Sequence, residues 1–332
     1  MADEPIAGRV IYRTLSENKA LQRTQRLACL RGLRFIHRNA LDGENFEDWA
    51  GDYLWCFYCI SCTSRDVELR ELAREFGVQC ARQWMASQDA LPELTDADEV
   101  AYYVSLLHVA SLLGIDNPRL RRHVQEGIRR FPARAYLGFD PLSEAPPSLP
   151  GRSRYDVWGG ALVLTYTGEG FGAPLSAEYA DVLRWLPEIR PYRGAGCGAN
   201  PEFRDIVFAI THLVYTLNDY SRYRLFPEWL PEEFEFLRSN LKEPLVTGDA
   251  ELLGEFMDSL RSFGVAESDP ALLSGVEYLL STQNVDGSWG DANEPDPYTR
   301  YHTAWTAVDA LHEYDWHERT VWPESVRQSF GR

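Results

Sequence analysis

The sequence has no long apolar segment and few basic residues for its length. No window reaches the ~18 consecutive apolar residues that a membrane-spanning helix needs, so we expect no integral membrane segment. Lysine and arginine number 33 against 50 aspartate and glutamate, a formal net charge of −17 at pH 7. Binding to nucleic acid or to anionic membranes needs basic patches, so this charge argues against both partners.

The pattern of a secretory signal peptide is also missing. MADEPIAGRVIYR, at the start of the sequence, has no basic stretch followed by an apolar one. We therefore expect a cytoplasmic protein whose six cysteines stay reduced. Cys56, Cys59 and Cys62 are spaced by three but lack a nearby fourth ligand. We interpret them as buried small residues and not as a zinc or iron–sulfur site.

Signatures of nucleotide binding and of serine nucleophiles are absent as well. The sequence has no P-loop, no G-x-G-x-x-G after a strand, and no G-x-S-x-G elbow. The glycine-rich stretch GAGCGAN, 194–200, is interpreted as a loop between helices. Alternating β-branched runs, which predict strands, are scarce. We therefore expect an all-α protein.

Helical periodicity recurs throughout, in segments of two alternating kinds. Amphipathic segments with one charged face occupy 24–40, 70–87, 119–136, 177–190, 231–245 and 270–283. Segments that are apolar nearly all round, as buried helices are, occupy 46–61, 96–113, 155–166, 203–219, 249–264 and 298–314. The fifth of these is the most polar.

Six outer helices alternating with six inner helices predict two concentric rings, an α6/α6 toroid of helical hairpins. A hairpin recurs every ~45–55 residues, and such a period marks repeated supersecondary units. We expect a single domain over residues 1–332. It has an N-terminal arm at 1–23, a long Pro/Gly-rich loop at 140–154 and a C-terminal tail at 315–332.

The stretch QNVDGSWG, 283–290, lies between the last outer and the last inner segment. Its Gln283, Asp286, Gly287 and Trp289 resemble the Q-x-x-D-G-x-W motif of squalene and terpene cyclases. In that family the glutamine caps a helix end, the tryptophan stacks over it, and adjacent repeats are tied together. The resemblance implies the toroid fold and a stabilising role for Gln283 and Trp289.

The next stretch, YTRYHTAWTAVDAL, 298–311, is similar to an inner helix of protein prenyltransferase β subunits. A histidine in a Y-H-T setting binds zinc there, which implies a zinc-ligating role for His302. The Asp-x-Cys pair that completes that zinc site is absent from this sequence.

TDADEVA, 95–101, resembles the D-x-D-D-T-A motif of class II terpene cyclases, whose middle aspartate protonates an alkene or epoxide. The resemblance implies that Asp98 is a catalytic acid. The fourth and fifth motif positions differ, being Glu99 and Val100. The structural alternative is that Thr95 caps a helix and Asp98 completes the capping arrangement.

Polar residues on the inner helices must be paired or must face the enclosed cavity. Among the histidines, His108, His212 and His302 lie in the body of inner segments, and Glu255 lies at a comparable depth on another. The polar residues selected in this way are Asp48, Asp52, Asp96, Asp98, Glu99, His108, Asp156, Asp205, His212, Asn218, Asp219, Glu255, Asp258, His302 and Asp309.

The densest polar stretch is ITHLVYTLNDYSRYRLFP, 210–227. His212, Tyr215 and Asp219 fall at i, i+3 and i+7, on one helical face. Asn218 and Arg222, four residues apart, lie beside that face. Such groups suit general acid–base work or the orientation of a charged substrate. They also suit a polar network that holds the helix C-terminus.

The function we predict is an enzyme that cyclises or rearranges a small, natural-product or terpenoid-like substrate by acid–base chemistry, without a cofactor. The substrate is held by aromatic walls whose ring faces stabilise positive charge. The predicted catalytic residues are His212, His302, Glu255, Tyr215, Asp98 and Asp219. The predicted substrate-binding residues are His108, Trp55, Tyr102, Trp158, Asn218, Arg222 and Trp305.

Two alternatives stay open. The first is a metal-dependent enzyme in which zinc or iron is bound by His212, His302 and either Glu255 or Asp205. The second is a non-catalytic toroid that binds a ligand or a partner. Besides a small-molecule substrate, the partners considered are a second copy of the chain and an enzyme of the same pathway.

Overall fold

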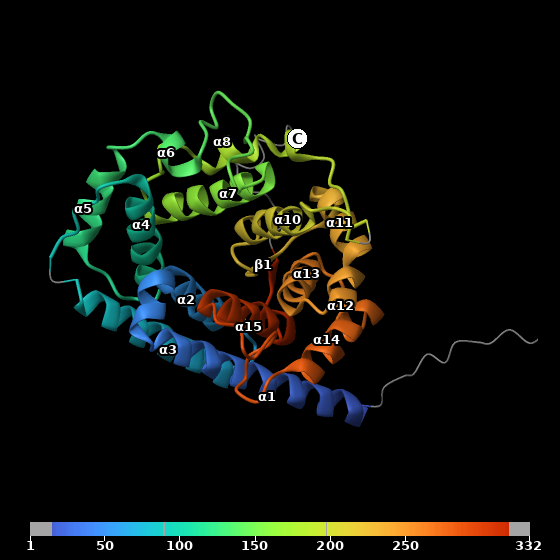
Figure 1. The fold of residues 1–332 in the computed structure, drawn as a ribbon. Coiled ribbons are helices and arrows are strands. Elements are labelled where there is room, and N and C mark those ends of the chain that lie inside the picture. The colour runs from blue at the N-terminus through green and yellow to red at the C-terminus, as the bar shows by residue number, and fades with distance from the viewer. Residues whose placement is uncertain (1–14, 89, 197, 319–332) are drawn as a thin grey trace, which may run out of the picture.

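The computed structural model describes residues 15–88, 90–196 and 198–318. Over these ranges the chain is a single all-α domain, which confirms the all-α, single-domain part of the predicted fold (Figure 1). The α-helices are α1 (Leu15–Ala40), α2 (Gly43–Thr63), α3 (Val67–Ala86), α4 (Ala97–Leu112), α5 (Pro118–Ile128), α6 (Ala133–Leu137), α7 (Arg154–Phe171), α8 (Tyr179–Leu183), α9 (Leu186–Ile189), α10 (Phe203–Leu217), α11 (Pro231–Asn240), α12 (Lys242–Thr247), α13 (Ala250–Ser262), α14 (Pro270–Thr282) and α15 (Pro297–Leu311). A 3-10 turn, η1 (Pro227–Trp229), and two paired segments, β1 (Tyr223–Arg224) and β2 (His317–Glu318), complete the described elements.

Six helices form a closed cycle of contacts at the centre of the molecule. In order they are α2, α4, α7, α10, α13 and α15, and α15 packs against α2 again (Figure 1). They coincide with the six segments that the sequence marks as apolar nearly all round. Helix α13 has the most polar sequence of these segments, yet all of its residues are buried. Its polar side chains must therefore be paired or must face an internal space.

The remaining helices lie on the periphery and pack against the central ones. Helix α3 packs on α2, α5 on α4, α8 on α7, and α11, α12 and α14 on α13. Three predicted outer helices are each divided in two, so continuous helices were wrong there. A proline lies at or near the start of the second half of each divided helix. Pro132 precedes α6, Pro187 lies in the first turn of α9 and Pro244 lies in the first turn of α12. Proline cannot continue a helix without losing a backbone hydrogen bond.

The predicted arm, loop and tail are met only in part. Helix α1 starts at Leu15, so the arm predicted over 1–23 is helical from there, and residues 1–14 lie outside the described part. Between α6 and α7 the chain has no helix, as predicted for the long loop. Leu149 and Arg152 form an isolated antiparallel β-bridge there. The predicted tail is described as far as residue 318, and β2 pairs in parallel with β1.

Gln283 and Trp289 join α14 to α1. Gln283 ends α14, and its Nε2 donates to the carbonyls of Ala28, 2.9 Å away, and Gly287, 3.0 Å away. The buried Trp289 donates from Nε1 to the Leu279 carbonyl at 2.7 Å, which satisfies a group left open in the last turn of α14. Gln283 thus connects the end of α14 to α1 and to the loop that follows, and Trp289 bonds to the last turn of α14.

The carboxyl ends of four central helices meet at one end of the molecule. The segment after α15 runs across them: the Asp315 amide donates to the Thr63 carbonyl at 2.7 Å, at the end of α2. The His317 amide donates to the Arg222 carbonyl at 2.9 Å, beyond α10. The Leu225 amide donates to the Ser262 carbonyl at 2.9 Å, at the end of α13.

Across the described ranges, no helix combines the length and the apolar character that a bilayer crossing requires.

Candidate functional site

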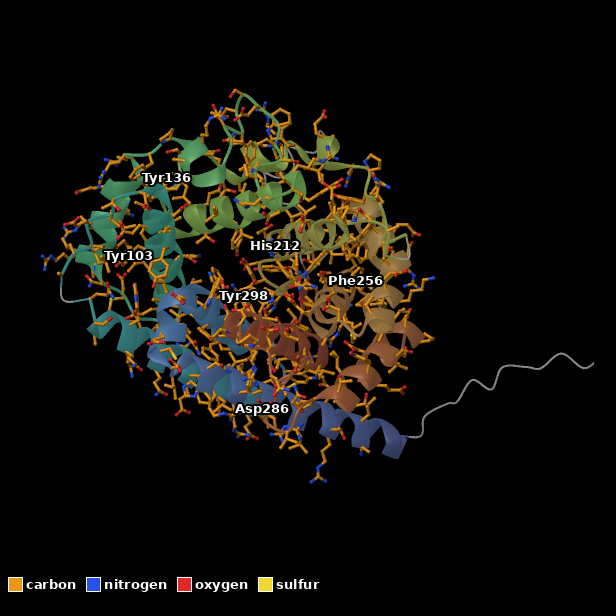
Figure 2. All side chains as sticks on the ribbon, viewed as in Figure 1. Tyr103, Tyr136, His212, Phe256, Asp286 and Tyr298 are labelled. Carbon is orange, nitrogen blue, oxygen red and sulfur yellow. The ribbon has the colours of Figure 1, made fainter. Side chains whose placement is uncertain are left out.

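A cavity of about 320 Å³ lies between α2, α7, α10, α13 and α15. This volume is in the range of small-molecule sites. In Figure 2, His212 and Tyr298 lie toward the centre of the molecule, whereas Tyr136 and Asp286 lie near its rim. The lining residues are Asp52, Cys59, Thr63, Gly160, Val163, Leu164, His212, Tyr215, Tyr220, Ser221, Glu255, Asp258, Tyr298, His302, Trp305, Thr306, Asp309 and Tyr314.

Helical spacing explains how the polar residues reach the cavity. Helix α15 contributes His302, Trp305, Thr306 and Asp309 at i, i+3, i+4 and i+7, which is one face of the helix. Helices α13 and α10 each contribute a shorter stripe of the same kind, Glu255 with Asp258 and His212 with Tyr215. Three apolar helices therefore each turn a polar stripe inward.

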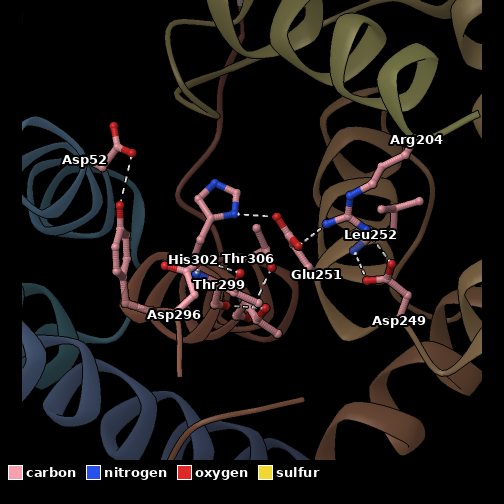
Figure 3. A network of polar contacts seen from close by, with 11 residues as sticks. Asp52, Arg204, Asp249, Glu251, Leu252, Asp296, Thr299, His302 and Thr306 are labelled. Carbon is pink, nitrogen blue, oxygen red and sulfur yellow. Dashed lines mark hydrogen bonds and ion pairs between the residues drawn. The ribbon is translucent and has the colours of Figure 1, made fainter. Parts of the chain in front are cut away.

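The best-connected group of the cavity is His302. Its Nδ1 lies 2.8 Å from Oε1 of Glu251, in the first turn of α13 (Figure 3). The other oxygen of Glu251 accepts from Arg204, which also donates to Asp249 at 2.6 Å. The His302 ring stacks on Tyr298, with ring centroids 5.0 Å apart. The ring is thus fixed, and Nε2 is the nitrogen available to a molecule in the cavity.

This pairing makes His302 the most basic histidine of the site. Burial alone would lower its pKa, but the hydrogen bond to Glu251 and the nearby carboxylates raise the pKa above the ordinary value. Burial likewise opposes the ionisation of Glu251, yet His302 and Arg204 hold its pKa below the ordinary value. The contact thus favours the imidazolium form of His302 and the carboxylate form of Glu251.

His212 is tuned in the opposite direction. Burial and the charge of His302 lower its pKa to about 4, so the imidazole is neutral at pH 7. The pKa values of two histidines that line the cavity are thus shifted in opposite directions. Environments that separate the pKa values of neighbouring groups assign acid and base roles at one pH.

Three carboxyl groups of the cavity hold their protons unusually tightly. Burial raises the pKa of Glu255 to about 7, that of Asp258 to about 6 and that of Asp309 to about 8. Oε2 of Glu255 and Oδ1 of Asp258 are buried without a hydrogen-bond partner. Near neutral pH these groups can both donate and accept protons.

An unusual turn brings Tyr220 and Ser221 to the cavity. Helix α10 ends at Leu217, and the three residues from Asp219 to Ser221 have left-handed φ values of 57°, 51° and 61°. Side chains other than glycine rarely adopt this conformation, which costs roughly 1–2 kcal/mol per residue. Ser221 then donates to Oδ2 of Asp258 at 2.7 Å, and the Tyr220 ring stacks on Trp55 at 4.7 Å.

Five predicted site residues line this cavity. They are His212, His302, Glu255, Tyr215 and Trp305. The partner of His302, however, is Glu251 and not Glu255.

The other predicted residues lie elsewhere. Because α10 ends at Leu217, Asp219 leaves the helical face predicted for it and accepts from Tyr166 and from Arg222, the latter at 3.3 Å. Asn218 ends α10 and accepts from the Ser221 amide at 2.7 Å. Asp205 lies in the first turn of α10, outside the lining.

Asp98 is exposed in the first turn of α4 and is not part of the lining. The cap of that helix is formed by Asp96, whose side chain accepts from the Glu99 amide at 2.9 Å. Glu99 in turn accepts from the Thr95 amide at 2.7 Å. The capping pair is thus Asp96 with Glu99, and not the predicted Thr95 with Asp98.

The predicted aromatic contacts are mostly structural. Trp158 is fully buried and donates to the Val182 carbonyl at 3.0 Å. Tyr102 donates to the Glu47 carbonyl at 3.1 Å. His108 and Trp55 pack together, with ring centroids 5.6 Å apart, outside the lining.

The main residue that sequence reasoning missed is Glu251. It lies one turn before Glu255 on the same helix, so an i, i+4 search from Glu255 finds it. Asp52, Asp258 and Asp309 also line the cavity. The sequence predicts them as polar residues of the inner helices but does not single them out as catalytic or substrate-binding residues.

The described residues do not provide the metal site of the alternative prediction. Within the ranges that the structure covers, no group of three or more His, Cys, Asp and Glu side chains is arranged to bind a metal ion. This holds for the predicted set of His212, His302, Glu255 and Asp205.

Comparison with known proteins found no significant similarity to any family model, curated protein or solved structure. The function is therefore inferred from the residues of the site.

Proposed function

We propose that this chain is an enzyme that cyclises or rearranges a small substrate in the central cavity by acid–base chemistry. The observation that carries the proposal is the gathering of His212, His302, Glu255 and Asp309 around one aromatic-walled space. Their pKa values are shifted away from the ordinary values in different directions, as is typical of groups that transfer protons.

We also propose that the helices form an α6/α6 toroid of the terpene-cyclase and prenyltransferase kind. The closed cycle of contacts among the six central helices supports this arrangement. So do the contacts of Gln283 and Trp289, which link the last outer helix to the first. In a toroid the cavity lies where the central helices converge.

The reaction starts from the protonated carboxyl of Asp309. It donates its proton to an alkene carbon or an epoxide oxygen of the substrate, which leaves Asp309 as a carboxylate and the substrate as a cation. The faces of Trp305 and Tyr298 stabilise this cation. After the substrate rearranges, the neutral imidazole of His212 accepts a proton from the substrate cation, which becomes neutral. His212 then releases this proton to solvent, and solvent returns a proton to Asp309. The product is an isomer of the substrate, with no change of oxidation state.

Solvent deuterium tests this reaction. The protein is incubated in deuterated buffer with a panel of small unsaturated alcohols. Products are returned to ordinary water, which removes deuterium from hydroxyl groups, and are analysed by mass spectrometry. We expect an isomer that keeps one carbon-bound deuterium from the buffer. Asp309→Asn and His212→Gln should each lower its rate at least ~100-fold, the low end for a general acid or base. Circular dichroism checks that both variants stay folded.

The control is Glu126→Gln, an exposed residue of α5, which should leave turnover unchanged. Full turnover in the Asp309→Asn/His212→Gln double variant would contradict the proposal. So would an isomer formed without deuterium.

A further inference from the structure

Elsewhere in this chain, buried carboxylates are neutralised by arginine. Glu233 is fully buried and accepts from Arg190 at 2.8 and 2.5 Å and from the Tyr192 hydroxyl at 2.6 Å. Glu251, also buried, accepts from Arg204. This is the usual arrangement, because an unpaired charge in the interior is costly.

The carboxyl groups of the cavity depart from this pattern. Glu255 and Asp258 are 3% and 1% exposed, and neither forms an ion pair with any arginine or lysine of the described residues. Each has one oxygen without a hydrogen-bond partner. Asp52 and Asp309 add two more carboxyl groups to the lining, which contains no arginine or lysine.

The positive charges nearby are already engaged. Arg261 donates to the carbonyls of Asp309, Ala310 and His312 and pairs with Glu267 at 2.7 Å. His302 is paired with Glu251. The cavity therefore contains carboxyl groups that no positive side chain of the described residues neutralises.

Backbone and aromatic groups favour the same kind of ligand. The carboxyl ends of α2, α10 and α13 meet at the end of the cavity marked by Thr63, Ser221 and Asp258, and helix carboxyl ends carry partial negative charge. Rings of Tyr298 and Trp305 also line the space, and aromatic faces attract cations.

We infer that the ligand of this cavity is a small organic cation, an amine whose ammonium group lies between Glu255 and Asp258 and whose carbon skeleton packs on the aromatic wall. The inference deepens the proposed function, on which it rests for the role of the cavity as a substrate site. The ammonium group would supply hydrogen bonds to the two unpartnered carboxyl oxygens.

Three probes with one carbon skeleton test the charge preference. Phenethylamine is cationic, 2-phenylethanol is neutral and phenylacetate is anionic at pH 7.5. Isothermal titration calorimetry with the full chain should show phenethylamine binding at least ~10-fold tighter than 2-phenylethanol, about 1.4 kcal/mol, with no binding of phenylacetate. Equal or tighter binding of the alcohol or the acid would overturn the inference. So would the absence of phenethylamine binding at ~10 mM.

Isosteric variants locate the ammonium group. Glu255→Gln and Asp258→Asn should each weaken phenethylamine binding ~10-fold or more and leave 2-phenylethanol binding unchanged. Glu126→Gln, exposed on α5, should change neither. Thermal unfolding shows whether each variant is folded. Unchanged phenethylamine affinity in a folded Glu255→Gln/Asp258→Asn double variant would place the amine elsewhere and overturn the inference.

The two proposals fail separately. Selective amine binding without deuterium-labelled turnover would support the cation site and contradict the proposed reaction. Turnover that depends on Asp309 and His212, without selective amine binding, would support the reaction and contradict the cation site.

Discussion

Nδ1 of His302 lies 2.8 Å from Oε1 of Glu251, and this contact joins two closely packed helices, α13 and α15. The glutamate is held in turn by Arg204. A carboxylate on one ring nitrogen fixes the orientation of the imidazole and stabilises its charged form. The contact therefore sets the state of the cavity histidine from outside the cavity lining.

Replacement of Glu251 by glutamine should remove the carboxylate that stabilises the charged form of His302. In Glu251→Gln, the pKa of His302 should fall below the ordinary histidine value of about 6.5, because burial then acts against the charged form. A folded variant should also be less stable by roughly 1–3 kcal/mol, since His302 loses a charged hydrogen-bond partner. Arg204 adds little to this loss, because it is half-exposed and keeps Asp249. NMR titration of the imidazole and chemical unfolding measure the two effects. An unchanged His302 pKa would show that the contact does not set its charge.

The close approach of α13 and α15 depends on Gly254. A Cβ at this position would come within 2.5 Å of the backbone of Thr306. Gly254→Ala should therefore force the helices apart and lower the free energy of unfolding by roughly 1–3 kcal/mol, as overpacking does. Gly43→Ala is the matched control, because a Cβ there meets nothing within 4 Å. Equal stability of the two variants by urea unfolding would refute the packing argument.

Stability should fall as pH rises through the neutral range. Glu255 and Asp309, with pKa values of about 7 and about 8, keep their protons to higher pH folded than unfolded. Their contribution to stability is therefore present at acidic pH and is lost as pH rises through those values. His302, whose pKa is also raised, acts in the same direction. His212 acts oppositely, but only below pH ~6.5.

Thermal unfolding between pH 6.5 and 9 checks this expectation. The wild-type chain should lose on the order of 2 kcal/mol across this range. The Glu255→Gln/Asp309→Asn double variant cannot titrate at these positions, so its decline should be smaller. Parallel curves for the two proteins would show that these carboxyls are already ionised in the folded state.

Trp289 should be important for stability and not for chemistry. Its ring is 1% exposed and packs over Gly32, and it lies outside the cavity lining. Trp289→Ala should lower the free energy of unfolding by ~3 kcal/mol, in the range for a buried aromatic. Trp289→Phe, which keeps a ring but loses the bond to the Leu279 carbonyl, should cost less. Abolished turnover with unchanged melting in Trp289→Ala would reverse this assignment.

The helical architecture could be predicted because each central helix carries its signal locally. Apolar residues all round a segment mark burial whatever the partner is. Prolines such as Pro132 and Pro187 also mark the breaks in the outer segments. The apolar periodicity continues past these prolines, and it therefore predicts one long helix where the structure has two short ones.

The site could be predicted only in part, because a stripe of residues on one helix does not identify what faces it. His212 and Tyr215 share a face as expected, whereas Asp219 leaves that face in a left-handed turn for which the sequence offers no glycine signal. The pairing of His302 with Glu251 depends on the relative positions of α13 and α15. The exposed position of Asp98 depends on which residue caps α4, and Asp96 and Asp98 have the same capping chemistry.

The closed cycle of contacts has a consequence for folding. Gln283 binds the Ala28 carbonyl across a sequence separation of 255 residues, and α15 packs against both α1 and α2. An open array of helical hairpins can grow from any neighbouring pair. Here the final contacts require the two halves of the sequence to meet, and contacts of such long range slow folding. The chain should therefore fold slowly, and the cavity should become complete only when α15 packs against α2.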